Sequence, residues 1–141
     1  MPNCKKLLLL MFCALLIGAA MVSTAYAEDL GGVSPQKALE YMQKNYPNLI
    51  IIDTALPQYY EKQHFAGAIN IPANEMSERY QEIPEGAKVI LHCRIGKTVL
   101  PAYRVLQQHR PDLEFSYINN APPFEAYNKW VEDKEKEKLK P

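Results

Sequence analysis

Four short, mainly apolar runs recur along the chain after residue 48. They are Leu49 to Ile52, Ala68 to Ile71, Lys88 to His92 and Glu114 to Ile118. Branched apolar residues in short runs bounded by turn residues are typical of strands that are covered on both faces. The pattern therefore predicts four strands of a parallel sheet.

The segments around these runs carry helix signals. Ser34-Pro35 is a typical helix start, and Pro47 ends that segment. Further helices are expected over Pro57 to Lys62, Glu75 to Gln81 and Thr98 to Gln108. Strands that alternate with helices predict an α/β fold, with a central parallel sheet and helices on both faces.

The first 27 of the 141 residues have a different character. Lys5 and Lys6 precede an uncharged segment from Leu7 to Ala27, which ends in Ala25-Tyr26-Ala27. A basic start, an apolar middle and a small-x-small exit are the order of a secretory signal peptide. We expect residues 1–27 to be cleaved and the protein to be periplasmic or otherwise exported. The alternative is an uncleaved membrane anchor, since about 20 apolar residues can span a bilayer.

The chain after residue 27 is long enough for one domain. We expect residues 28–33 to be an N-terminal extension, 34–131 a single domain and 132–141 a charged tail, either a solvated helix end or frayed. Lys5 and Lys6 belong to the 16 basic residues, whereas all 16 acidic residues lie beyond residue 27, so the remainder has a formal charge near −2. This charge gives no general attraction to nucleic acid, and no membrane contact is expected after cleavage.

Cysteine usage narrows the chemistry. Cys4 and Cys13 lie in the predicted signal segment, which leaves Cys93 alone in the domain. Exported compartments favour paired cysteines, so a lone thiol there is either buried and inert or chemically used. The absence of a second cysteine excludes a dithiol oxidoreductase and a cysteine-rich zinc site.

Cys93 stands where a strand should turn into a helix. Ligands of parallel α/β sheets collect at this edge. Gly96 allows the turn to curl its amide groups around the sulfur, and Arg94 and Lys97 add two cations. These effects favour thiolate over thiol, which predicts a nucleophile at the mouth of the bend. The alternative is a small buried hydrophobic residue.

In this segment and two others the chain resembles the rhodanese-like sulfurtransferases. Cys93-Arg94-Ile95-Gly96-Lys97-Thr98 is similar to their six-residue active-site loop. Asp53 at a strand end, with the run from His64 to Pro72 after it, resembles their first signature. Phe124-Glu125-Ala126-Tyr127 resembles their closing motif. The likeness covers roughly residues 34–130, and with a signal peptide in front the chain looks most like small exported single-domain members.

The resemblance implies a two-step sulfur transfer. Cys93 would attack thiosulfate or a similar small anionic donor, keep one sulfur as a persulfide and pass it to a thiol or a cyanide-like acceptor. The substrate-binding residues would be Arg94, Ile95, Gly96, Lys97 and Thr98, with Asp53 and His64 in supporting roles. No metal or organic cofactor is implied. A protein partner is not indicated by the sequence.

Two alternatives compete with this function. Related phosphatases have a loop one residue longer that ends in arginine, and Val99 stands at that position here. Sulfur chemistry is therefore favoured over phosphate chemistry. The chain also departs from the family at Ala55, where arginine is common, and at Pro122-Pro123, where a glycine pair is usual. These departures leave open a catalytically weak or inactive module for binding or redox sensing.

Overall fold

A computed structural model describes residues 31–140. Within this range, five strands form one parallel sheet in the order β1-β5-β4-β2-β3. The strands are β1 (Gly32–Val33), β2 (Leu49–Asp53), β3 (Ile69–Asn70), β4 (Lys88–His92) and β5 (Glu114–Ile118). The expectation of an α/β fold with a central parallel sheet is confirmed.

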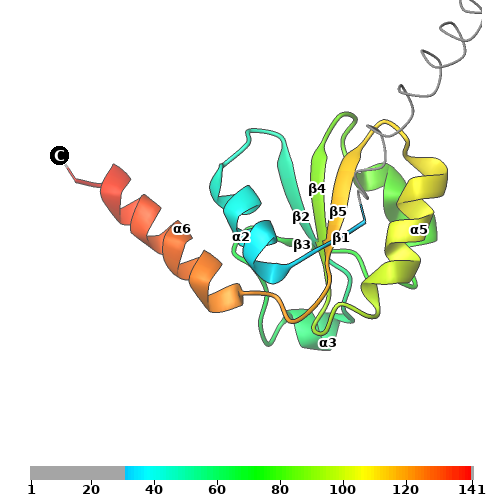
Figure 1. The fold of residues 1–141 in the computed structure, drawn as a ribbon, viewed down its shortest axis with the longest axis horizontal. Coiled ribbons are helices and arrows are strands. Elements are labelled where there is room, and N and C mark those ends of the chain that lie inside the picture. The colour runs from blue at the N-terminus through cyan, green and yellow to red at the C-terminus, as the bar shows by residue number, and fades with distance from the viewer. Residues whose placement is uncertain (1–30, 141) are drawn as a thin grey trace, which may run out of the picture. The chain divides into compact units, whose positions relative to one another are not determined.

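Helices cover both faces of this sheet (Figure 1). They are α2 (Pro35–Gln43), α3 (Pro57–Tyr60), α4 (Met76–Arg79), the 3-10 turn η1 (Tyr80–Glu82), α5 (Val99–His109) and α6 (Phe124–Lys138). Helices α2 and α6 pack on one face, and α4 and α5 pack on the other. The start of α2 is as predicted: Pro35 is in its first turn, and the Ser34 Oγ accepts a hydrogen bond from the Lys37 N–H at 3.2 Å.

The core consists of two layers separated by the sheet. The layer under α4 and α5 is mainly aliphatic and contains Ile52, Leu91 and Val99. The layer under α2 and α6 is richer in aromatic rings, including Phe65 and Phe124. Alternate residues of one strand face opposite sides, so each central strand contributes to both layers.

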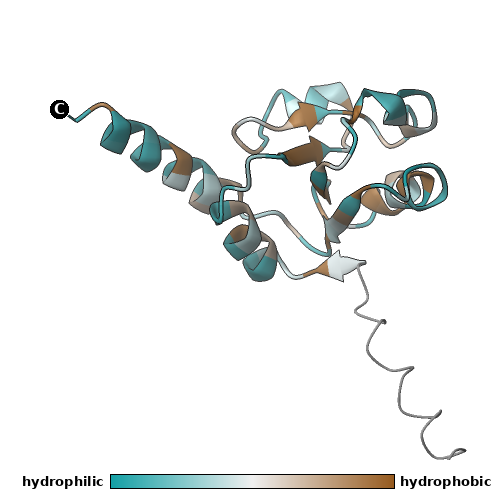
Figure 2. Ribbon diagram, turned by 90° about the horizontal axis from the view of Figure 1, so that it is seen from above, coloured by the Kyte–Doolittle hydropathy of each residue, from teal (hydrophilic) through white to brown (hydrophobic). Residues whose placement is uncertain are grey.

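Two features at the ends of the domain extend the sequence expectations. The strand β1, within the expected N-terminal extension, pairs with β5 through Gly32↔Tyr117 and Val33↔Ile118. The helix α6 continues to Lys138, so most of the expected charged tail is a solvated helix end. Figure 2 shows the last turns of α6 mainly in teal, consistent with their charged sequence. The predicted signal segment, residues 1–27, lies outside the described residues.

Candidate active site

The candidate site lies at the carboxyl ends of β2 and β4. These strands are parallel neighbours, and Asp53 is paired in register with His92. The Thr54 N–H and Oγ1 both donate to the His92 carbonyl, at 2.8 and 2.9 Å. The Asn70 side chain on β3 donates to the carbonyls of Asp53 and Ala55. Hydrogen bonds therefore connect the carboxyl ends of β2, β3 and β4 directly before the Cys93 loop begins.

Cys93 comes directly after the last residue of β4 and points into the aliphatic layer. Its side chain is 1% exposed and packs within the cluster that contains Leu91 and Val99. It is a free thiol. The sequence predicts this sulfur at the mouth of the bend, whereas in the structure it is buried.

Gly96 fixes the turn of this loop. Its φ is +73°, a backbone conformation that side chains rarely adopt. A Cβ at this position would lie 2.0 Å from the Asn119 carbonyl oxygen, which belongs to the connection from β5 to α6. Gly96 is thus required both by its backbone conformation and by the close approach of a second chain segment.

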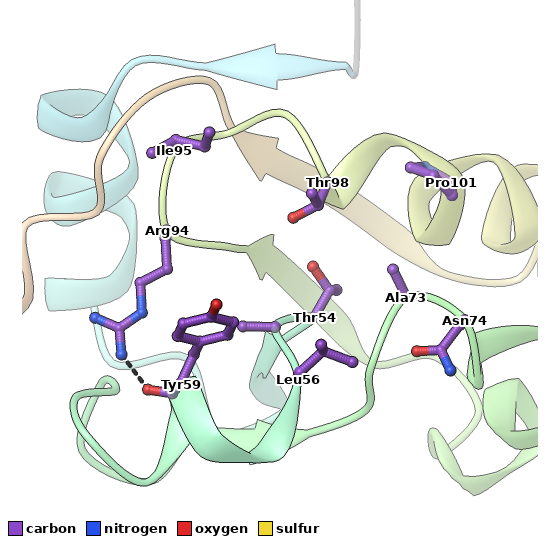
Figure 3. A pocket seen from close by; sticks show the side chains of 10 residues that line it. Thr54, Leu56, Tyr59, Ala73, Asn74, Arg94, Ile95, Thr98 and Pro101 are labelled. Carbon is purple, nitrogen blue, oxygen red and sulfur yellow. Dashed lines mark hydrogen bonds between the residues drawn. The ribbon is translucent and has the colours of Figure 1, made fainter.

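The Arg94 side chain is held by hydrogen bonds to other parts of the protein. Its Nη1 donates to the Gln63 Oε1 at 3.1 Å, and its Nη2 donates to the Gln63 carbonyl. Its Nη2 also donates to the Tyr59 carbonyl (Figure 3). Its guanidinium carbon lies 5.6 Å from the centre of the Phe124 ring. Arg94 therefore ties the loop to the segment after α3 and to the start of α6.

The other loop residues are mostly solvent-facing. Ile95, Lys97 and Thr98 are exposed, with Ile95 at 58%. Thr98 precedes the first residue of α5, but its side chain makes no capping hydrogen bond. A role for Thr98 as a simple helix cap is thus not supported by the geometry.

Asp53 and His92 form a buried polar pair on the opposite face of the sheet from Cys93. The His92 Nδ1 lies 3.9 Å from the Asp53 Oδ1, and both side chains are almost fully buried. Burial lowers the pKa of His92 to about 3, so the ring is neutral at pH 7. Burial also raises the pKa of Asp53, opposed by the hydrogen bond from the Ala55 N–H and by the charges of Arg94 and His64.

This pair is incompletely hydrogen-bonded. Asp53 Oδ1 accepts from the Ala55 N–H at 2.9 Å, as expected for a carboxylate that anchors local backbone. Within residues 31–140, four buried polar atoms here lack a hydrogen-bond partner: Asp53 Oδ2, His92 Nδ1, His92 Nε2 and Arg94 Nε. Since His92 packs edge-on against Phe65, a direct proton exchange between His92 and the Cys93 thiol is disfavoured by the geometry.

His64 has a local structural role. Its Nδ1 lies 2.8 Å from the Tyr60 carbonyl, and its ring stacks on the Tyr60 ring with a centroid separation of 4.1 Å. The Asn128 side chain bonds the His64 carbonyl and the Ala66 N–H at 2.9 and 2.7 Å. The first signature segment is thereby attached to α6.

A cavity of about 660 Å³ opens beside the loop (Figure 3). Its apolar wall is formed by Ala55, Leu56, Tyr59, Ala73, Ile95 and Pro101. Thr54, Asn74, Arg94 and Thr98 complete the lining. Apart from the loop residues and Ala55, sequence reasoning missed this wall. The available signal was a large apolar residue, Leu56, in the polar connection after β2.

The departures from the family pattern lie close to the loop. Ala55 is part of the cavity wall, where an arginine would be large and charged. Pro122-Pro123 precede α6, whose first N–H groups are bonded by proline carbonyls: the Phe124 N–H by Pro122 and the Tyr127 N–H by Pro123. Both prolines also line a second, smaller hollow on the other side of Arg94.

Two features are absent from residues 31–140. No group of three or more His, Cys, Asp or Glu side chains in this range is arranged to hold a metal ion. No helix in the same range has both the length and the apolar character required to cross a bilayer.

Sequence comparisons relate this chain to known proteins. The model of the rhodanese-like domain matches residues 34–133. The thiosulfate sulfurtransferase PspE of Escherichia coli (strain K12) is 29% identical over 72 residues, which cover 50% of this chain and 65% of PspE. The aligned part thus spans slightly less than two thirds of that relative.

Solved structures share the fold at low sequence identity. A protein from Saccharomyces cerevisiae superposes with a TM-score of 0.56 and 21% identity, covering 80% of this chain and 99% of its own. A rhodanese-related protein from Thermoplasma volcanium gives a TM-score of 0.55 and 19% identity, covering 72% and 91%. With the match over most of the described residues, the chain belongs to the rhodanese-like domain family, which is of the sulfurtransferase type.

Proposed function

We propose that this protein is a sulfurtransferase that carries sulfane sulfur on Cys93. The observation that carries the proposal is the position of Cys93 at the start of a turn between β4 and the 11-residue helix α5, in a family of sulfurtransferase type. The amide groups at the start of a helix carry partial positive charge, which suits the binding of an anionic sulfur donor beside the loop. The enzyme PspE acts on thiosulfate by its name, and we extend that donor class to this chain.

The proposed reaction has two balanced steps. The Cys93 thiolate attacks the outer sulfur of thiosulfate, the sulfur–sulfur bond of thiosulfate breaks, and sulfite leaves with the bonding electron pair. A thiophilic acceptor then attacks the outer sulfur of the persulfide, and Cys93 leaves as a thiolate. This is covalent catalysis by an activated cysteine, and neither step needs an external oxidant or reductant.

The enclosed position of Cys93 adds a requirement. A thiol with 1% exposure has to become reachable before it can attack a donor. Ile95, Lys97 and Thr98 are exposed, so the outer part of the loop can move without dismantling the core. We therefore propose that loop opening precedes sulfur uptake, with Arg94 and its bonds to Tyr59 and Gln63 holding one side of the loop.

Two supporting roles and a cellular site complete the proposal. Asp53 anchors the backbone at Ala55, and His64 anchors the segment after α3. Neither touches the reacting sulfur in the proposed reaction. We further propose that residues 1–27 direct export, with an uncleaved anchor as the alternative, because of their basic, apolar and small-residue order.

A second candidate function has its own observation. The burial of Cys93 among aliphatic side chains also suits an inert thiol in a module that binds a partner without sulfur turnover. The missing arginine at Ala55 agrees with this candidate.

The deciding experiment is intact mass spectrometry after thiosulfate treatment. The proposal predicts a gain of one sulfur atom, reversal by cyanide with release of thiocyanate, and no gain in Cys93→Ser. If neither the wild type nor Cys93→Ser gains mass after thiosulfate treatment and both give the same background release of thiocyanate, the inert module is the correct function.

A further inference from the structure

The cavity beside the Cys93 loop has an unusual surface for a site that handles small inorganic anions. Five large apolar residues within residues 31–140 are notably exposed: Leu56, Tyr59, Ile69, Ile95 and Leu139. Three of them, Leu56, Tyr59 and Ile95, line this one cavity. Exposed apolar side chains that gather at a single hollow mark a binding surface more often than scattered ones do.

The charges of the cavity point in the same direction. Among residues 31–140, its lining contains no acidic residue and a single cation, Arg94. The guanidinium group of Arg94 already donates to Tyr59 and Gln63, so it offers little to a free anion. The volume of about 660 Å³ is that of a small-molecule site, and such sites are mainly apolar with a few polar groups.

The cavity also shares residues with the surroundings of Cys93. Ala73 belongs to its wall and also packs against the aliphatic cluster that contains Cys93. Arg94, Ile95 and Thr98 come from the Cys93 loop itself. A molecule in the cavity would therefore lie against the loop that has to open for sulfur transfer (Figure 3).

We propose that this cavity binds the apolar body of an organic thiol, which is the sulfur acceptor. The inference rests on the proposed Cys93 persulfide. The acceptor thiolate attacks the outer sulfur, a new sulfur–sulfur bond forms on the acceptor, and the bond to the Cys93 Sγ breaks with its electron pair left on Sγ. The products are an organic persulfide and the Cys93 thiolate, with no net change in oxidation level.

Chain length of the acceptor provides the test. Ethanethiol, propanethiol, butanethiol and pentanethiol have similar thiol groups and differ only in apolar length. Burial of each methylene is expected to raise kcat/KM for discharge of the Cys93 persulfide by about fourfold. The persulfide is first loaded with thiosulfate and its discharge is followed by intact mass, with cyanide as an acceptor too small to use the apolar wall.

Variants on the surface locate the effect. Leu56→Gln and Tyr59→Gln replace side chains that are 44% and 45% exposed, and both should flatten the dependence on chain length. Ile69→Gln is the matched control, because Ile69 is 40% exposed but lies outside the cavity, on β3. It should keep the wild-type dependence.

The outcomes separate this inference from the proposed function. If Cys93 never gains sulfur, both are overturned. If Cys93 loads and cyanide discharges it, but all four thiols react at one rate, the sulfurtransferase stands and the apolar acceptor site is overturned. The same holds if Leu56→Gln and Tyr59→Gln keep the wild-type dependence on chain length.

Discussion

At the end of β4, two consecutive residues, His92 and Cys93, point to opposite faces of the sheet, and the two faces differ sharply there. Cys93 points into an aliphatic layer, whereas His92 points into an aromatic layer and faces Asp53. The first face holds the group proposed to react, and the second holds buried polar atoms without hydrogen-bond partners within residues 31–140.

The cysteine proposed to react and the buried polar pair beside it need not act together. Residues that are adjacent in a strand face opposite sides of a sheet. His92 and Cys93 are adjacent in the sequence, and the fold places their side chains in different layers. We therefore expect substitutions on the His92 face to change mainly the stability of the fold, and substitutions on the Cys93 face to change mainly sulfur uptake.

The largest expected effect is on stability, from Phe65→Ala. Phe65 is fully buried and packs against the rings of His92, Phe124 and Tyr127 at centroid separations of 4.7, 4.8 and 5.3 Å. Truncation should lower the free energy of unfolding by about 3–5 kcal/mol, measured by urea denaturation. The protein that remains folded should still take up sulfur on Cys93.

Cys93→Ala is the matched change on the other face. It removes one buried sulfur atom, so the expected loss of stability is only about 1 kcal/mol, while sulfur uptake disappears completely. Should Phe65→Ala abolish uptake in the folded fraction, the division of labour between the two faces would be wrong.

The next effect concerns Gly96, the turn of the Cys93 loop. Gly96→Ala should lower the stability by about 2–4 kcal/mol and suppress sulfur uptake, since the new Cβ meets both the positive φ and the Asn119 carbonyl. Gly86→Ala is its control, because Gly86 has a φ of +66° and, apart from its chain neighbours, no atom of residues 31–140 lies within 4 Å of where its Cβ would be. That variant should lose about 1 kcal/mol and keep uptake. Equal losses in the two variants would show that the close approach of Asn119 is unimportant.

Much of this architecture could be predicted from local patterns. The strands β4 and β5 have the bounds that their apolar runs predict, and the start of α2 is signalled by Ser34-Pro35. The strand β1 could not be predicted, because two residues beginning with glycine carry no periodicity. The full length of α6 was also hidden, because its last turns contain almost only charged residues and lack an apolar face.

The sequence predicts where the site residues lie in the fold, but not how their side chains are oriented. The place of Cys93 at a strand end can be read from the sequence, but its enclosure depends on how Ala73 and α5 pack around it. The partners of Arg94 lie 31 and 35 residues away in the chain, so no local pattern announces them. The contact between Gly96 and Asn119 is likewise a product of the tertiary fold.

A further difference between the faces is their response to pH. Burial lowers the pKa of His92 from 6.5 to about 3, so between these values the unfolded chain binds a proton that the folded chain excludes. The stability should therefore fall as pH decreases below 6.5, by up to about 1.4 kcal/mol per pH unit. His92→Leu should remove this slope and leave stability at pH 7 within about 1 kcal/mol of the wild type, since it deletes two unpartnered polar atoms.

The neighbouring groups define the range in which this test is clean. The pKa of Asp53 is raised, mainly by burial, so Asp53 contributes with the opposite sign at pH values above its ordinary 3.8. Urea denaturation of wild type and His92→Leu is therefore compared between pH 6.5 and 5, with Asp53, His64 and Arg94 present in both proteins. Identical slopes would mean that His92 does not resist protonation in the folded state.

The smallest expected effect is that of Lys97 on the Cys93 face. Lys97 is an exposed cation of the loop, and thiosulfate is a doubly charged anion, so the side chain should accelerate encounter without touching the sulfur. Lys97→Met should slow sulfur uptake about two- to fivefold at low ionic strength, and the difference should fade at high salt because ions screen exposed charges. Lys134→Met is the control, since Lys134 lies on α6 and is paired with Glu137 at 3.1 Å. If both variants slow uptake equally, the effect comes from net charge, and Lys97 has no local part in bringing the donor to Cys93.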